Sequence, residues 1–188
     1  MTSDATDRLD LVPALFTWTF VDGNITRHPE SHFLDFVVNG LSLSMAVSEA
    51  DYGNLVTPLN RPFLPSVPTA VDHLLGRSPD PDLEPGRNLI LVCGVCGGLD
   101  CGAVTAQVLL SDAQVTWCDW RLENGYEDAK PFDAFVPTMT FERRSYETQL
   151  IGSFARLDEF PYHELAHQGR GFLWPWQWGW RMPAKPQP

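Results

Sequence analysis

Three cysteines lie close together in a glycine-rich segment, Cys93-Gly-Val-Cys96-Gly-Gly-Leu-Asp-Cys101. The C-x2-C spacing lets two thiolates face one metal ion, and a third thiolate at Cys101 suits a knuckle-like zinc or iron site. The glycines at 94 and 97 allow the positive φ angles that a tight loop needs. We therefore predict a structural zinc site whose sulfur atoms lie within about 4 Å of one another, given Zn–S bonds of about 2.3 Å.

Structural zinc takes four ligands, and the cysteine loop offers three thiolates. The fourth ligand stays open among several groups: Asp100, His163, His167, another histidine or water. Two other interpretations of the loop also stay open, because the thiols can be reduced and purely structural, or the C-x2-C pair can be redox-active. A redox-active thiol needs a lowered pKa from a helix N-terminus or a nearby cation, whereas this loop leads into a strand and contains an aspartate.

The remaining cysteine, Cys118, is expected to be a small buried residue and not a ligand. A tight turn at residues 111–114 would pair Gln107 with Cys118 in a hairpin. This register places Cys118 about 20 Å along the strand from the position opposite Cys101, at about 3.3 Å per residue. Free cysteine commonly behaves as a small apolar side chain.

A histidine pair near the C-terminus matches a second metal pattern, H-E-x-x-H, at His163-Glu164-Leu-Ala-His167. On a helix the two imidazoles can bind zinc together, and the glutamate can act as general base toward a bound water. The pattern is incomplete, because no His, Asp, Glu or Cys follows His167 and Arg170 stands where the longer form of the motif has glycine. We predict a short surface helix here, with a zinc-dependent hydrolase as the alternative. The other histidines are expected to be ordinary polar residues: His28, His32 and His73.

The last 18 residues are rich in tryptophan and proline. Four indoles alternate with other residues, and they would point to one side of an extended chain: Trp174, Trp176, Trp178 and Trp180. Such a row of indoles is expected to pack against another surface, because tryptophan is enriched at interaction hot spots. The tail is expected to pack on its own domain, or to bind a protein partner or a second copy of the chain as a homodimer.

Composition narrows the class of partner. The chain has 188 residues, 44% of them hydrophobic, with 13 Lys+Arg against 24 Asp+Glu and a net charge of −11. This acidic balance argues against binding nucleic acid or an anionic membrane surface, both of which attract clustered cations. The first ten residues, MTSDATDRLD, lack an apolar run and predict a flexible acidic leader, and a cytoplasmic location, instead of a secretory signal. The carboxylates Asp119, Glu123, Glu127 and Asp128 are expected to form a solvated rim that, if functional, receives a basic partner.

Several elements must position these residues. Asn39-Gly40 predicts a type I′ hairpin between strands at 33–38 and 41–47. A short helix at 66–75 would end at Gly76, and a longer one at 141–157 carries an apolar stripe that includes Tyr146 and Leu150. Strands are predicted at 88–93, 103–110 and 115–120. The fold class is α+β, a mainly antiparallel sheet with two or three short helices, in a single domain at 11–170 followed by the tail at 171–188.

Residues 85–150 carry three patterns in order: a C-x2-C-G-x3-C-G-A-V-T loop, a W-x-D strand followed by E-N-x-Y, and an F-x-R-x2-Y-E-x2-L helix. The matching residues are Cys93, Cys96, Gly97, Cys101, Gly102, Trp117, Asp119, Glu123, Asn124, Tyr126, Phe141, Arg143, Tyr146, Glu147 and Leu150. On these motifs the chain resembles an uncharacterised bacterial protein family. The resemblance implies that the loop, the hairpin and the helix form one unit, and it implies no activity.

The sequence as a whole predicts a non-enzymatic, acidic, cytoplasmic binding or accessory protein with structural zinc at Cys93, Cys96 and Cys101. The alternative is the zinc-dependent hydrolase that would use His163, Glu164 and His167.

Overall fold

The computed structural model of the protein describes residues 6–22, 25–27, 29–49, 55–132 and 137–162. The described strands are β1 (Leu9–Thr17), β2 (Phe20–Asp22), β3 (Ile25–Arg27), β4 (Glu30–Val38), β5 (Leu41–Ser42), β6 (Leu55–Val56), β7 (Arg87–Cys93), β8 (Ala103–Leu110), β9 (Gln114–Glu123), β10 (Lys130–Pro131) and β11 (Met139–Glu142). The helices are α1 (Leu43–Glu49), α2 (Val67–Leu74), α3 (Arg143–Ile151) and α4 (Ser153–Asp158), with 3-10 turns η1 (Arg61–Ser66) and η2 (Leu99–Cys101). The predicted α+β class is confirmed.

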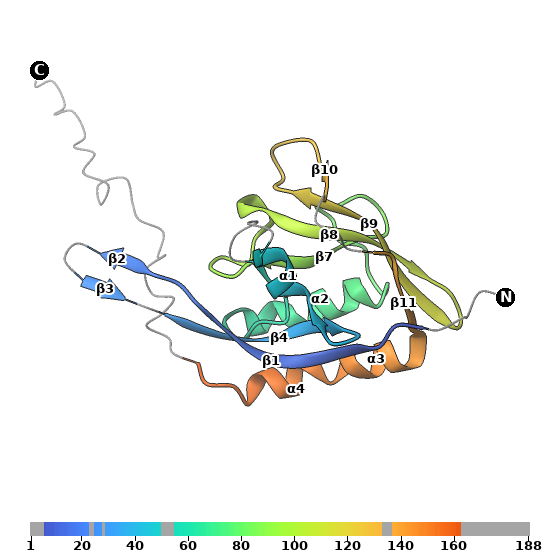
Figure 1. Ribbon diagram of the computed structural model, residues 1–188, viewed down its shortest axis with the longest axis horizontal. Helices are drawn as coiled ribbons and strands as arrows, with labels where there is room; N and C mark the ends of the chain where they lie inside the picture. The colour runs from blue at the N-terminus through green and yellow to red at the C-terminus, as the bar shows by residue number, and fades with distance from the viewer. Residues whose placement is uncertain (1–5, 23–24, 28, 50–54, 133–136, 163–188) are drawn as a thin grey trace, which may run out of the picture.

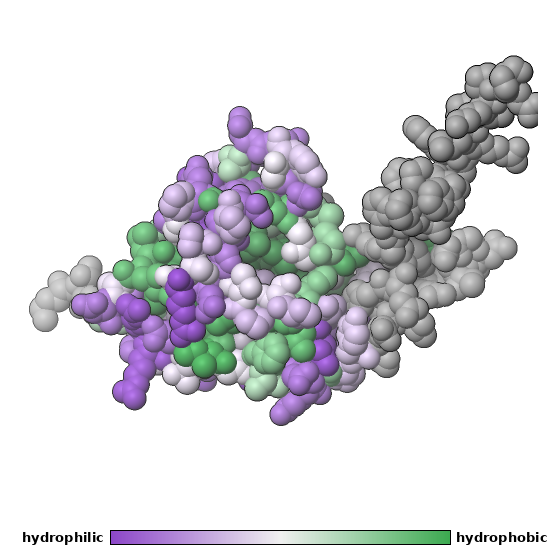
Figure 2. Space-filling view, turned by 180° about the vertical axis from the view of Figure 1, so that it is seen from behind, coloured by the Kyte–Doolittle hydropathy of each residue, from purple (hydrophilic) through white to green (hydrophobic). Residues whose placement is uncertain are grey.

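The named strands pair in antiparallel fashion in two main sheets. One sheet has the order β10-β9-β8-β7-β6, with β11 pairing with residues 114–117 of β9 and β10 with residues 121–122, and the other has the order β1-β4-β5. In Figure 1, α3 and α4 run along β1 and β4 at the base of the molecule, and β7, β8 and β9 lie above them. Seen from the opposite side, the surface mixes hydrophilic and hydrophobic side chains (Figure 2).

The first hairpin is one long ladder that reaches the cysteine loop. β1 pairs with β4 from Leu9↔Val38 to Thr17↔Glu30, and β2 continues the same register against β3. The β2–β3 end projects from the body in Figure 1. Since Leu9 and Leu11 are buried in the core, the predicted leader at 1–10 is too long: β1 begins at Leu9, and the Asp7 side chain accepts a hydrogen bond from the amide of Thr140.

The second predicted strand of the Asn39-Gly40 hairpin is mostly wrong. The turn itself is confirmed, with φ of 52° at Asn39 and 86° at Gly40, but β5 ends at Ser42 and α1 follows. Polar groups start the helix here, because the Ser42 hydroxyl accepts the amide of Met45 and the Asp35 carboxylate accepts the amide of Ser44. A carboxylate and a hydroxyl at the first turn satisfy amides that have no partner within a helix.

The helix predicted at 141–157 begins later and is interrupted. Residues Met139–Glu142 form β11 against β9, and the Glu142 side chain then accepts the amides of Arg144 and Ser145 as an N-cap. Gly152 separates α3 from α4. Of the predicted apolar stripe, Tyr146, Leu150 and Leu157 are buried, while Phe154 is 41% exposed.

The two sheets and the helices share a core that is centred on Trp117 of β9. Its ring makes edge contacts with four other aromatic rings, those of Phe36, Trp120, Phe141 and Tyr146. The Trp117 indole N–H donates to the Tyr146 hydroxyl at 3.2 Å, and this hydroxyl donates to the carbonyl of Leu74 at 3.1 Å. Leu74 ends α2, where carbonyls lack partners within the helix. The Tyr146 hydroxyl therefore joins β9, α3 and α2.

Replacing Tyr146 by phenylalanine is expected to lower the free energy of unfolding by about 2 kcal/mol, because it leaves a buried indole N–H and a buried carbonyl without partners. Urea unfolding would measure the change. The matched control is Tyr126→Phe, at a tyrosine that is 77% exposed, for which we expect a change within about 0.5 kcal/mol. Equal effects of the two substitutions would contradict the role assigned to the Tyr146 hydroxyl.

None of the helices in the described residues has both the length and the apolar character that crossing a membrane requires. The predicted H-E-x-x-H segment and the tryptophan-rich tail lie outside the described residues.

Candidate metal centre

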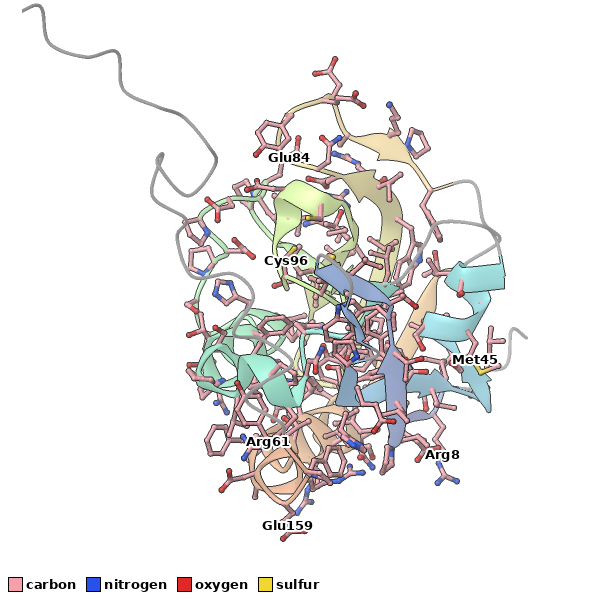
Figure 3. The ribbon with its side chains drawn as sticks, turned by 90° about the vertical axis from the view of Figure 1, so that its left-hand side faces the viewer. Arg8, Met45, Arg61, Glu84, Cys96 and Glu159 are labelled. Atoms are coloured by element: carbon pink, nitrogen blue, oxygen red, sulfur yellow. The ribbon has the colours of Figure 1, made fainter. Side chains whose placement is uncertain are left out.

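The cysteine loop connects two adjacent strands of the larger sheet. Cys93 is the last residue of β7, Cys101 ends η2, and β8 begins two residues later at Ala103. The amide of Gly97 donates to the carbonyl of Cys93 at 2.8 Å and closes the first turn of the loop. The antiparallel pairing of β7 with β8 brings the two ends of the loop together, and the turn folds Cys96 back toward them (Figure 3).

The three thiols converge, although the bound on their spacing is wider than the predicted value of about 4 Å. The sulfur atoms of Cys93, Cys96 and Cys101 all lie within 4.8 Å of one another, and those of Cys96 and Cys101 are 3.1 Å apart. Zn–S bonds of about 2.3 Å in a tetrahedral site place sulfurs about 3.8 Å apart. The Cys96–Cys101 spacing is shorter than this value, and all three spacings lie within 4.8 Å. These three cysteines form a cluster that could hold a metal ion.

Two aromatic rings fix the backbone of the loop. A Cβ atom added at Gly94 would lie 2.7 Å from the ring of Phe16 in β1, and one added at Gly97 would lie 3.1 Å from the ring of Phe63 in η1. Gly97 also has φ of 69°, which disfavours any side chain. The prediction of positive φ therefore holds at Gly97 but not at Gly94, where the requirement for glycine comes from close packing against Phe16.

Among the described residues, no cation contributes to the shift of the Cys101 pKa. The hydrogen bond with Cys96, followed by partial desolvation and the negative charge of the neighbouring thiolates, raises the pKa of Cys101 to about 11. A redox-active cysteine needs the opposite shift, toward a stable thiolate. A divalent cation would stabilise three neighbouring cysteines as thiolates, since metal binding displaces the thiol protons.

Asp100, the fourth-ligand candidate within the cysteine loop, does not join the three converging thiols. The Asp100 carboxylate is directed to the Tyr126 side chain, where its negative charge and a hydrogen bond raise the pKa of the phenol. Within the described ranges, the converging ligand atoms are the three thiols alone. His163 and His167, the other named candidates, lie outside those ranges.

Cys118 lies elsewhere, in the register that was predicted. It pairs with Gln107 in the β8–β9 hairpin, and its sulfur is 3.8 Å from the Gln107 carbonyl. The expectation that it is buried is wrong, because Cys118 is only half-buried. Successive strand residues face opposite sides of a sheet, so its neighbour Trp117 takes the core side and Cys118 the outer side.

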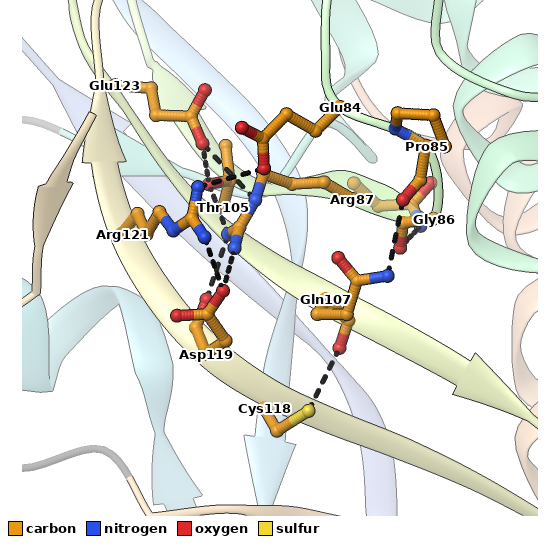
Figure 4. Close-up of polar contacts among 11 residues, drawn as sticks. Glu84, Pro85, Gly86, Arg87, Thr105, Gln107, Cys118, Asp119, Arg121 and Glu123 are labelled. Atoms are coloured by element: carbon orange, nitrogen blue, oxygen red, sulfur yellow. Dashed lines mark hydrogen bonds and ion pairs between the residues drawn. The ribbon is translucent and has the colours of Figure 1, made fainter. Parts of the chain in front are cut away.

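The carboxylates predicted as a solvated rim include two that serve the fold. Asp119 occupies a bulge of β9 with φ of 48°, and its carboxylate and carbonyl both bind the guanidinium of Arg87. Arg87, the first residue of β7, is buried; its guanidinium also donates to the hydroxyl of Thr105 in β8 and lies 3.5 Å from the Glu123 carboxylate in β9 (Figure 4). The sequence analysis did not single out Arg87. The one feature that could have indicated its role is its position as a cation directly before an apolar strand.

Comparisons with family models, with curated proteins and with solved structures found no match for this chain.

Proposed function

We propose that Cys93, Cys96 and Cys101 bind a structural zinc ion, and that the protein is a non-enzymatic, acidic binding or accessory module of the cytoplasm. The observation that carries the proposal is the convergence of three sulfur atoms within 4.8 Å in one loop. Zinc suits this set better than an iron–sulfur cluster, because clusters are commonly held by four cysteines, whereas zinc accepts three protein thiolates and one further ligand.

A structural role is supported by where the ligands lie. The loop leaves β7 at Cys93 and returns at Cys101 just before β8, so one ion would tie together the ends of two neighbouring strands. Phe16 and Phe63 pack against the same loop from β1 and η1. A metal here would therefore fix the contact of both sheets with the loop.

The fourth coordination position has room on the side of Cys101, the exposed member of the cluster. Water or a ligand from outside the described residues can complete the site there. The acidic surface favours a basic protein over an acidic one as partner, and the indole row at 174–180 is our proposed contact with that partner or with a second copy of the chain.

Metal analysis of the chain purified without a histidine tag tests the proposal. We expect about one zinc per chain, retained in Cys118→Ser and lost when Cys93, Cys96 and Cys101 are all replaced by serine. Cys118→Ser is the matched control because it removes one thiol outside the cluster. Zinc that survives the triple substitution and is lost in the His163→Ala, His167→Ala double variant would overturn the proposal in favour of the hydrolase.

A further inference from the structure

A cavity of about 360 Å³ lies beside the cysteine loop. Its walls come from η1, α2, the segment after α2, β7 and the loop itself, with Cys96 and Gly97 on the loop side. The volume falls within the range of small-molecule pockets, about 300–1,000 Å³. Most of its lining is apolar and includes Phe63, Ala70, Leu89 and Val92. Two polar side chains of the lining are His73 and Asp80.

Two polar side chains of the cavity wall are largely buried and poorly matched to each other. His73, in the last turn of α2, is 11% exposed, and Asp80 is 12% exposed. The His73 Nδ1 atom lies 3.9 Å from the Asp80 carboxylate, too far for a hydrogen bond, and no other described residue is its hydrogen-bond partner. Burying a polar group without a partner is costly, so an arrangement of this kind indicates a site that a ligand completes.

The Asp80 carboxylate has no permanent counter-ion. One of its oxygens accepts the amide of Asp82 at 3.0 Å, and its only ion-pair partner among the described residues is the imidazole of His73. A mostly buried carboxylate without lysine or arginine is stabilised by any cation that reaches it. The described residues that line the cavity include no lysine or arginine.

We infer that this cavity binds a small organic cation, an amine with an apolar body. The ammonium group donates to the Asp80 carboxylate, and the body packs between Phe63, Leu89 and Val92. The net charge of −11 favours the approach of a cation and disfavours an anion of the same shape. This site goes beyond the proposed zinc centre, and the binding of an amine does not require the metal.

Isothermal titration with three probes of similar shape tests the inference. Benzylammonium carries the charge, benzyl alcohol lacks it, and benzoate reverses it. We expect benzylammonium to bind with a dissociation constant below about 1 mM, benzyl alcohol to bind at least about tenfold more weakly, and benzoate not to bind. Equal binding of benzylammonium and benzyl alcohol, or no binding of either, would overturn the inference.

Variants identify the site. Asp80→Asn keeps the oxygen that accepts the Asp82 amide and removes the charge, so it should weaken benzylammonium binding by about tenfold or more. Asp72→Asn is the matched control, because Asp72 lies in α2 next to His73 but is 46% exposed and paired with Arg77. Ala70→Leu should block the cavity and abolish binding even if Asp80→Asn folds poorly.

The metal centre and the amine site can be judged separately. Cys101→Ser, which would impair zinc binding, should leave benzylammonium affinity unchanged within about twofold, since Cys101 does not line the cavity. Unchanged affinity in Asp80→Asn, or equal loss in Asp72→Asn, would refute the assigned site whatever the metal content.

Discussion

Replacing Arg87 by leucine is expected to lower the free energy of unfolding by about 3 kcal/mol. The guanidinium is fully buried and donates to the Thr105 hydroxyl at 3.0 Å and to the Asp119 carbonyl at 2.8 Å, besides its ion pair with the Asp119 carboxylate. Removing one partner of a buried ion pair leaves the other charge uncompensated, which typically costs about 3–5 kcal/mol. The lower end applies because Asp119 is 52% exposed and can be rehydrated.

Arg121→Leu is the matched control for this prediction. It removes the same charge from the same carboxylate, but Arg121 is 27% exposed and its other partner, Glu84, is 67% exposed. Exposed ion pairs contribute about 0–1 kcal/mol, so Arg121→Leu should be mild. Chemical unfolding of both variants measures the difference, and similar losses in the two would contradict the structural role given to Arg87.

Zinc binding is expected to fall more than about 100-fold in Cys101→Ser. Replacing a residue that hydrogen-bonds to a metal ligand already lowers metal affinity by about 10–100-fold, so removing the ligand itself must lower it more. Because Cys101 is exposed, serine at this position should disturb packing little, so the effect would report the metal. Competition with a chromophoric chelator measures the affinity.

The same variant separates metal-dependent stability from packing. With free zinc at about 1,000 times its dissociation constant, binding stabilises the native chain by about 4 kcal/mol. For a chain of this size that corresponds to a rise of about 8–16 °C in Tm. We expect a chelator to reverse this rise in the parent chain and in Cys118→Ser, and to change nothing in Cys101→Ser. A chelator effect that persists in Cys101→Ser would place the ion elsewhere.

Local sequence signals predicted the elements around the metal centre well. The apolar run before Cys93, the β8–β9 hairpin with Gln107 opposite Cys118, and the stop at Gly76 all appear in the structure. These features depend on alternation, turn chemistry and glycine, which act over a few residues. The convergence of the three sulfurs followed from spacing in the same way.

Features that depend on distant residues were not predictable from the chain alone. The segment 41–47 was predicted as a strand, but most of it is the helix α1. The Asp35 carboxylate of the preceding strand binds the first turn of this helix. The ion pair of Asp119 was not predicted because its partner, Arg87, is 32 positions away. The His73–Asp80 pair likewise becomes a candidate site only when η1, β7 and the cysteine loop close a cavity over it.

X-ray absorption at the zinc edge, on the full chain loaded with one equivalent of zinc, tests the central claim most directly. If the three thiols hold the zinc ion, we expect three sulfur ligands at about 2.3 Å and one lighter ligand at about 2.0–2.1 Å. A first shell of nitrogen and oxygen without sulfur would contradict it, because the three thiols could not then be the atoms that hold the metal.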